Sequence, residues 1–88
     1  MDVAVVAYNW VEGLVESAEW AYDQRGSKIS LSVVAQEVYD CVEEIYGDKI
    51  TKTDITIAVM KYFNTHGPEP WMDLNAKDIV EMHVWATL

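Results

Sequence analysis

Cysteine, proline and glycine are scarce in this sequence, which contains one, two and four of them in 88 residues. The single cysteine, Cys41, cannot form a disulfide within the chain, which favours a reducing compartment and predicts a packing role for the thiol. We therefore expect a cytoplasmic protein. The apolar start, residues 1–11, carries Asp2 but no Lys or Arg and is too short to span a bilayer, so we interpret it as part of the fold.

Basic residues are also scarce. Fifteen Asp and Glu residues against six Lys and Arg residues give a formal net charge of −9, which opposes direct binding to nucleic acid or anionic lipid. The imbalance is concentrated in residues 2–48, which hold ten acidic and two basic residues. Because 51% of the residues are hydrophobic, including four Trp and five Tyr, the composition indicates a folded acidic domain rather than a disordered tail.

The sequence lacks the residue patterns of the common catalytic sites. It contains no nucleophile–base set, no glycine-rich phosphate loop and no metal-ligand spacing, so we expect neither an enzyme nor a bound metal or cofactor. His66 and His83 lie 17 residues apart, and neither has a second ligand at helical spacing. His66 precedes a glycine, where a helix C-terminus favours partial positive charge. Structural roles are the simpler interpretation of both histidines.

Apolar side chains recur at helical spacing through most of the chain. In the stretch 31–46 they share one arc of a helix, with acidic residues on the opposite arc. The apolar arc comprises Leu31, Val34, Ala35, Val38, Cys41, Val42 and Ile45. Such a stripe must be buried against other helices. A second stripe follows residues 3–25, where Val3, Ala7, Trp10, Val11, Leu14, Ala18 and Ala21 share a face, although the composition of residues 3–8 also suits a strand.

Three similar breaks divide these segments. Gly26, Gly47 and Gly67 suit the position after a helix, while Ser30, Thr51 and Asn75 suit the N-cap of the next one. Thr51 and Asp54 have the spacing of a capping box, and Leu74 and Ile79 that of a hydrophobic staple. The sequence thus predicts a single all-α domain, residues 1–88, built as a compact bundle of about four helices at 3–25, 30–46, 51–66 and 75–88. The last segment also alternates like a strand from Val80 to Leu88, but the predicted cap favours a helix.

Two acidic rows dominate the predicted surface. The first consists of Glu12, Glu16, Glu19 and Asp23, and the second of Glu37, Asp40, Glu44 and Asp48. Spacings of 3 and 4 place about one charge per 5 to 6 Å along each helix at ~1.5 Å per residue. If the two helices lie side by side, their combined charge density approaches the ~3.4 Å per charge of one DNA strand. We expect these residues to contact a partner protein with a basic surface.

This pattern leads to a functional hypothesis. In size, charge and lack of catalytic motifs the chain resembles the small acidic inhibitors that phages use against restriction or CRISPR machinery. That resemblance implies a DNA mimic that occupies the nucleic-acid-binding surface of another protein and inhibits it. An immunity protein that neutralises a nuclease would rely on the same electrostatics.

Two alternatives use other parts of the sequence. A helical assembly module could form a homodimer through apolar contacts of Ile57, Met60, Trp71 or Trp85, with the acidic residues conferring solubility. Residues 30–46 and 51–66 also have the spacing of a helix-turn-helix. The candidate recognition helix, however, offers only Lys52 and Lys61, and its acidic neighbour opposes binding to DNA.

Overall fold

The computed structural model describes the backbone of residues 1–74 and 76–87, and the side chains of residues 1–74 and 80–87. Within these residues the chain is all-α. It forms the helices α1 (Val3–Arg25), α2 (Leu31–Tyr46), α3 (Lys52–His66) and α4 (Ala76–Thr87), with a short 3-10 turn, η1 (Gly47–Lys49), after α2. The predicted bundle of four helices is confirmed, and the bounds of the first three agree with prediction to within one residue.

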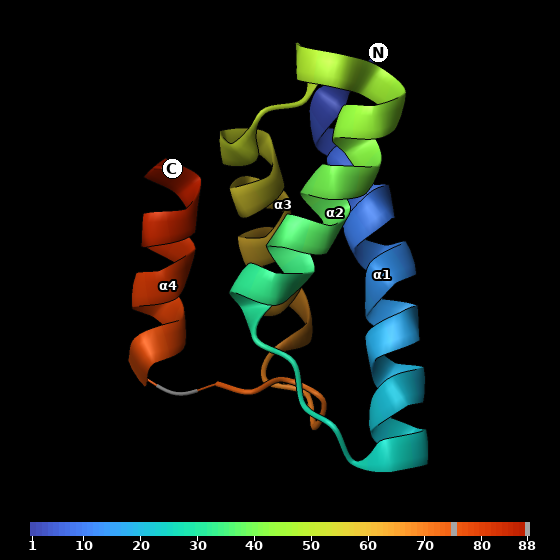
Figure 1. Ribbon diagram of the computed structural model, residues 1–88, viewed down its shortest axis with the longest axis vertical. Helices are drawn as coiled ribbons and strands as arrows, with labels where there is room; N and C mark the ends of the chain where they lie inside the picture. Colours follow the sequence, from blue (N-terminus) through green and yellow to red (C-terminus); the bar gives the residue numbers. More distant parts are fainter. Residues whose placement is uncertain (75, 88) are drawn as a thin grey trace.

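The first three helices run up and down, each antiparallel to the one before, whereas α4 runs parallel to α2 (Figure 1). Helix α1 packs against both α2 and α3, and α4 packs against α2 and α3. The chain therefore places α2 between α1 on one side and α4 on the other, and this arrangement defines the surfaces described below.

Local sequence signals account for the ends of α1. The Asp2 carboxylate accepts hydrogen bonds from the backbone N–H groups of Ala4 (3.1 Å) and Val5 (3.3 Å), which satisfies donors that have no partner within the helix. Helix therefore begins at Val3, and the alternative of an extended start is wrong. Gly26 ends the helix in the left-handed conformation, with φ of 68°, and its N–H donates to the Tyr22 carbonyl at 2.7 Å.

The predicted caps of α2 and α3 behave differently. Thr51 and Asp54 form the predicted capping box: the Thr51 hydroxyl accepts from the Asp54 N–H at 3.2 Å, and the Asp54 carboxylate accepts from the Thr51 N–H at 2.9 Å. Ser30 does occupy the N-cap position of α2, but its side chain makes no capping hydrogen bond. Its hydroxyl lies 3.2 Å from the Ser32 hydroxyl instead.

The last segment is a helix, not a strand. Met82 and Trp85 are buried, whereas Val80 and Val84 are exposed, so burial follows a spacing of three residues rather than two. The predicted cap Asn75 lies outside the described residues, as does the Ile79 side chain, so the proposed Leu74–Ile79 staple lies outside them as well.

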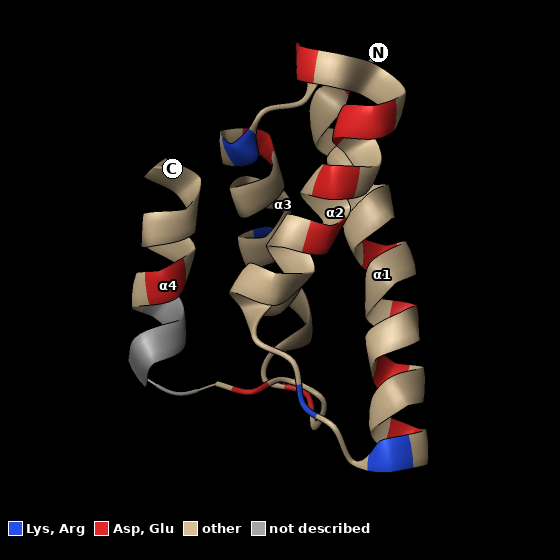
Figure 2. Cartoon of the chain, in the orientation of Figure 1, with Lys and Arg blue, Asp and Glu red and all other residues tan. Residues whose placement is uncertain are grey.

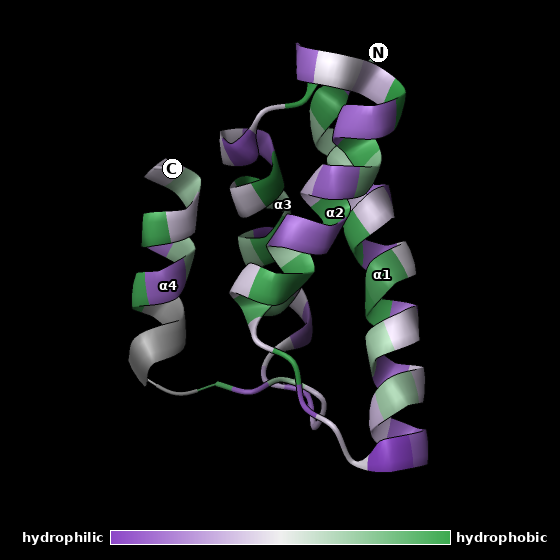
Figure 3. Cartoon of the chain, in the orientation of Figure 1, coloured by the Kyte–Doolittle hydropathy of each residue, from purple (hydrophilic) through white to green (hydrophobic). Residues whose placement is uncertain are grey.

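The core lies between the inner faces of the helices (Figure 3). Val38, in the middle of α2, is fully buried, as the apolar arc predicts. Val15 of α1 is also buried although the predicted stripe omitted it. Ile45 is 58% exposed, which contradicts its predicted core position. It points along the apolar arc, but in the last turn of α2 it is not covered by a neighbouring element.

The loop after α3 closes one end of the core. Trp71 and Met72 are 2% and 4% exposed. The backbone there pairs with the loop after α1: the Ile29 N–H donates to the Trp71 carbonyl, and the Asp73 N–H donates to the Ile29 carbonyl, both at 3.0 Å. This Trp–Met pair covers that end of the core, and the backbone pairing fixes the point at which the chain turns towards α4.

Candidate interaction surfaces

The acidic row of α1 is exposed along its whole length. Its members are Glu12, Glu16, Glu19 and Asp23. Trp20 lies at the edge of the same row, four residues after Glu16 and three before Asp23, and is 58% exposed. A large aromatic ring in water is unusual on a small monomeric domain, and Trp is enriched among the residues that dominate protein–protein binding energy. We refer to these five residues as the α1 acidic face.

The acidic row of α2 and η1 is exposed as well. It comprises Glu37, Asp40, Glu44 and Asp48. Asp40 is held in place from within the fold, because the Gln36 amide donates to it at 2.8 Å while the Gln36 carbonyl oxygen accepts from the Trp85 indole N–H at 2.6 Å. This chain of hydrogen bonds connects the α2 row to a buried side chain of α4.

The two rows do not form a single face. Glu19 and Asp23 border the loop after α3, where they line a small depression with Tyr22, Glu69 and Pro70. Glu37 instead lies beside Leu14, Ser17 and Ala21, on the opposite flank of α1. In Figure 2 the acidic residues of α2 lie on turns facing the viewer, while those of α1 lie mostly on the rear of its ribbon. Helices α1 and α2 are neighbours as predicted, but the doubled charge density does not arise.

The carboxylates of the two acidic rows have no basic partner among the described side chains. Among the described side chains, no Lys or Arg forms an ion pair with Asp or Glu, and the one ionic contact joins His66 to Glu69 at 4.0 Å. Two lysines lie over aromatic rings instead: the Lys61 ammonium is 5.4 Å from the Tyr8 ring centre, and Lys52 is 5.2 Å from that of Trp85. Repulsion among the surface carboxylates is therefore left for solvent ions or a partner to relieve.

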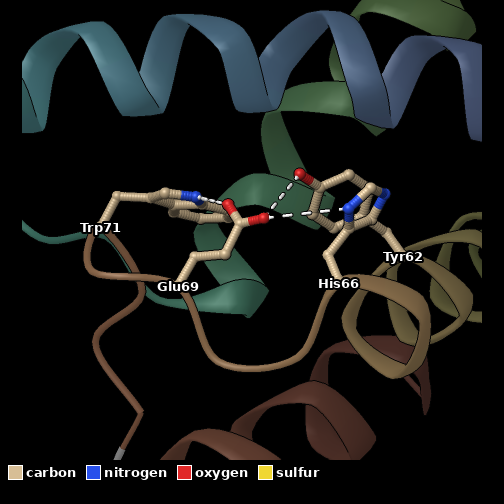
Figure 4. A network of polar contacts seen from close by, with 4 residues as sticks. All are labelled: Tyr62, His66, Glu69 and Trp71. Atoms are coloured by element: carbon tan, nitrogen blue, oxygen red, sulfur yellow. Dashed lines mark hydrogen bonds and ion pairs between the residues drawn. The ribbon is translucent and has the colours of Figure 1, made fainter.

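Glu69 organises a polar network beneath α1 (Figure 4). Its carboxylate accepts hydrogen bonds from the Tyr62 hydroxyl, at 3.3 Å, and from the Trp71 indole N–H. The His66 ring stacks on Tyr62 with ring centres 4.2 Å apart. Burial, together with the charge of Glu69, raises the pKa of Tyr62. The hydrogen bonds of Tyr62 and Trp71 to Glu69 anchor the loop after α3, and the stacked His66 ring packs against this network.

The same network perturbs the α1 acidic face. Desolvation, followed by the negative charge of Glu69, raises the pKa of Glu19 above its usual value, and the charges of Asp23 and Glu16 act in the same direction. The surroundings of Glu19 therefore disfavour its ionised form, and a nearby cation would favour it.

An apolar groove runs along the surface between α2 and α4. It has a volume of about 450 Å³ and is lined chiefly by Val33 and Glu37 of α2 and by Val80, Glu81, Val84 and Trp85 of α4. The three valines are 44%, 59% and 51% exposed, respectively. The predicted sites did not include this groove. The sequence shows Val80 and Val84 as part of an alternating apolar pattern, but their exposure depends on how α4 packs against α2 and α3.

Of the four residues predicted to make apolar contacts with a second copy, two lie at the surface and two lie in the core. Ile57 is 59% exposed and Met60 is half-buried, and both line a shallow depression on the outer side of α3. Trp71 and Trp85 are 2% and 8% exposed, so their assignment to a contact surface is wrong. Each ring packs in this chain's own core and directs its indole N–H to a partner within the fold, Glu69 or Gln36.

The described residues hold no cluster of three or more His, Cys, Asp or Glu side chains arranged to bind a metal ion. None of the described helices is both long and apolar enough to cross a membrane.

Comparison of the chain with protein-family models, curated proteins and solved structures finds no match.

Proposed function

We propose that this chain is a small, non-enzymatic cytoplasmic binding protein whose acidic surface occupies a basic, nucleic-acid-binding surface of another protein and inhibits it. The observation that carries the proposal is the α1 acidic face, where an exposed tryptophan is bordered by carboxylates that have no basic partner in the described fold. Lys and Arg side chains of a partner would gain both charge pairing and contact with the indole ring. A phage-type inhibitor of restriction or CRISPR proteins, or a nuclease immunity protein, would act in this way.

Because the two acidic rows lie on different flanks, they cannot contact one surface of a partner together. A continuous imitation of a DNA strand would need both rows on one side, whereas each row here presents about one charge per 5 to 6 Å by itself. We therefore assign the first contact to α1, where the aromatic residue adds affinity to the charge. The α2 row contributes mainly to the rate of association through the overall field of the molecule.

A capture experiment with charge-matched variants tests the proposal. The intact chain is immobilised and exposed to lysate treated with nuclease, and the retained proteins are identified at low salt and at about 0.5 M salt. We expect basic nucleic-acid-binding proteins to be retained at low salt, and labelled DNA to compete with the chain for them. Replacing Glu12, Glu16 and Glu19 with Gln, or Trp20 with Ala, should abolish retention.

The matched control is the variant Asp40→Asn, Glu44→Gln, Asp48→Asn, which changes the net charge by the same amount on the other row and leaves Glu37 in place. This control should still capture the partner, though with slower association. If both triple variants lose the partner equally, net charge rather than the α1 acidic face is responsible. Retention that persists at high salt, or that DNA does not compete away, would contradict the proposal.

A homo-oligomeric assembly module remains the second candidate, and the exposed Ile57 on α3 supports it. Apolar self-association is insensitive to screening or is strengthened by salt, so sedimentation at low and high salt separates the two functions. In this case Ile57→Asp should convert a dimer to a monomer, and the α1 variants should leave the dimer intact.

A further inference from the structure

The groove between α2 and α4 has the geometry of a site for a third helix. The two helices run parallel and in register: the Ser32 hydroxyl donates to Glu81 at 3.5 Å, and Gln36 accepts from Trp85 one turn later. Each wall of the groove carries two residues at a spacing of four, Val33 and Glu37 on α2, Val80 and Val84 on α4. A groove of this kind accepts side chains that recur at i, i+3, i+4 and i+7 on another helix.

The polar groups of the groove indicate the charge of its occupant. Glu81 is half-buried on the α4 side and is contacted by Ser32 at the long distance of 3.5 Å, while Glu37 is exposed on the α2 wall. Neither carboxylate forms an ion pair with a described Lys or Arg side chain. An apolar surface with a carboxylate on each wall is complementary to a segment that carries apolar residues flanked by Lys or Arg.

Two other occupants fit the groove less well. A second copy of this chain would bring another charge of −9 against an acidic rim, at a cost in repulsion. An extended peptide would leave its backbone N–H and C=O groups without partners, because the helical backbones of α2 and α4 use their own hydrogen-bonding groups internally. A helix satisfies its backbone by itself and presents only side chains.

We infer that the groove between α2 and α4 binds a basic amphipathic helix of a partner protein. The apolar stripe of that helix packs on Val33, Val80 and Val84, and its Lys or Arg side chains pair with Glu37 and Glu81. This site lies away from the α1 acidic face and does not depend on it, so a protein that engages both would be held at two separate points.

A designed peptide tests the inference directly. The probe is an 18-residue fluorescein-labelled helix with Leu at i, i+3, i+4 and i+7 and Lys and Arg on both flanks, titrated against the intact chain by fluorescence anisotropy. We expect saturable binding, weakened about tenfold or more by Val84→Asp. The control Ile57→Asp places the same charge at a similarly exposed apolar position on α3 and should change the affinity less than about twofold. Circular dichroism confirms that both variants fold.

A second set of measurements tests charge complementarity. The same peptide with Glu in place of Lys and Arg should bind wild type at least about tenfold more weakly, and Glu37→Lys should recover part of that loss. Glu81→Gln should weaken the basic peptide about three- to tenfold and leave the acidic one unchanged or improved.

Several outcomes would overturn the inference. They are no saturable binding of the basic peptide, equal loss of affinity in Val84→Asp and Ile57→Asp, and equal binding of the basic and acidic peptides. A wild-type dimer that Val84→Asp dissociates would assign the groove to a second copy instead. The α1 variants with Gln at Glu12, Glu16 and Glu19 should bind the peptide like wild type, so failure at the groove and failure at the α1 acidic face are distinguishable.

Discussion

Val38 shows how much a single position of this small core contributes to the fold. It is fully buried in the middle of α2, surrounded by other buried residues of the core. A charged group there would be removed from water without a partner, which costs several kcal/mol. A domain of this size has only about 5 to 15 kcal/mol of stability in total.

We therefore predict that Val38→Asp unfolds the protein or leaves it with greatly weakened helicity, measured by circular dichroism and thermal melting. Glu44→Val, on the exposed side of the same helix, should fold normally and lose only solubility. Equal folding of the two variants would show that the orientation of α2 is misassigned, and with it the position of the α2 acidic row.

The N-caps of α2 and α3 provide a second comparison at this scale. Thr51→Ala removes the two hydrogen bonds of the Thr51 hydroxyl, which accepts from the Asp54 N–H and donates to the Asp54 carboxylate. It should lower the free energy of unfolding by ~1 kcal/mol. Ser30→Ala removes a hydroxyl that makes no capping hydrogen bond, so its cost should be clearly smaller. Urea denaturation of the two variants measures both values. A larger loss for Ser30→Ala would contradict the assigned cap geometry.

Among the elements, α4 depends most on one side chain. Trp85 reaches from α4 to α2, where it donates to Gln36, meets the Tyr39 ring edge-on at 5.9 Å and lies beneath the Lys52 ammonium. These contacts come from α2 and α3, so they hold α4 against both helices. They also form one end of the groove between α2 and α4.

Trp85→Ala should therefore release α4 before the rest of the bundle unfolds. Large-to-small replacements of buried Trp cost about 3 to 5 kcal/mol, and this cost should fall mainly on α4. Hydrogen exchange should show early loss of amide protection in residues 80–87, with α1 to α3 still protected. Val84→Ala, which shortens an exposed side chain one residue away, should leave exchange unchanged. Uniform loss of protection in all four helices would mean that α4 unfolds only with the whole domain.

At the scale of the whole molecule, negative charge opposes folding. The net charge is −9, and no described Lys or Arg offsets a carboxylate by ion pairing. Self-repulsion of this kind destabilises a compact state and is screened by salt. The surface proposed to bind a partner thus lowers the stability of the free protein.

We predict that replacing Glu12, Glu16 and Glu19 together with Gln leaves the melting temperature at pH 7 unchanged or raises it. The gain should shrink towards pH 4. Glu19 has a raised pKa in the folded state, so between its unfolded and folded pKa values the folded chain binds more protons, and stability falls as pH rises through that window. Gln removes this loss. Thermal melts from pH 4 to 7 measure the effect, and unfolding of the triple variant at pH 7 would make these residues structural.

The sequence alone determined the helices. Their periodicity, the glycine that ends α1 and the capping box that begins α3 act over a few residues, so these elements could be predicted without knowing their neighbours. The buried position of Val38 and the exposure of the acidic residues also follow from the direction in which a side chain leaves its helix. The net charge follows from composition, and the lack of the common catalytic patterns follows from the order of the residues.

Only the tertiary structure decided which predicted faces are covered. Ile45 shares the apolar arc of Val38 yet is exposed, and Trp71 and Trp85 looked like surface contacts yet fill the core. The two acidic rows lie on different flanks because α1 packs against both α2 and α3, and a groove remains where α4 docks beside α2. Periodicity gives the direction of a side chain relative to its own helix axis, but burial depends on whether another element lies in that direction.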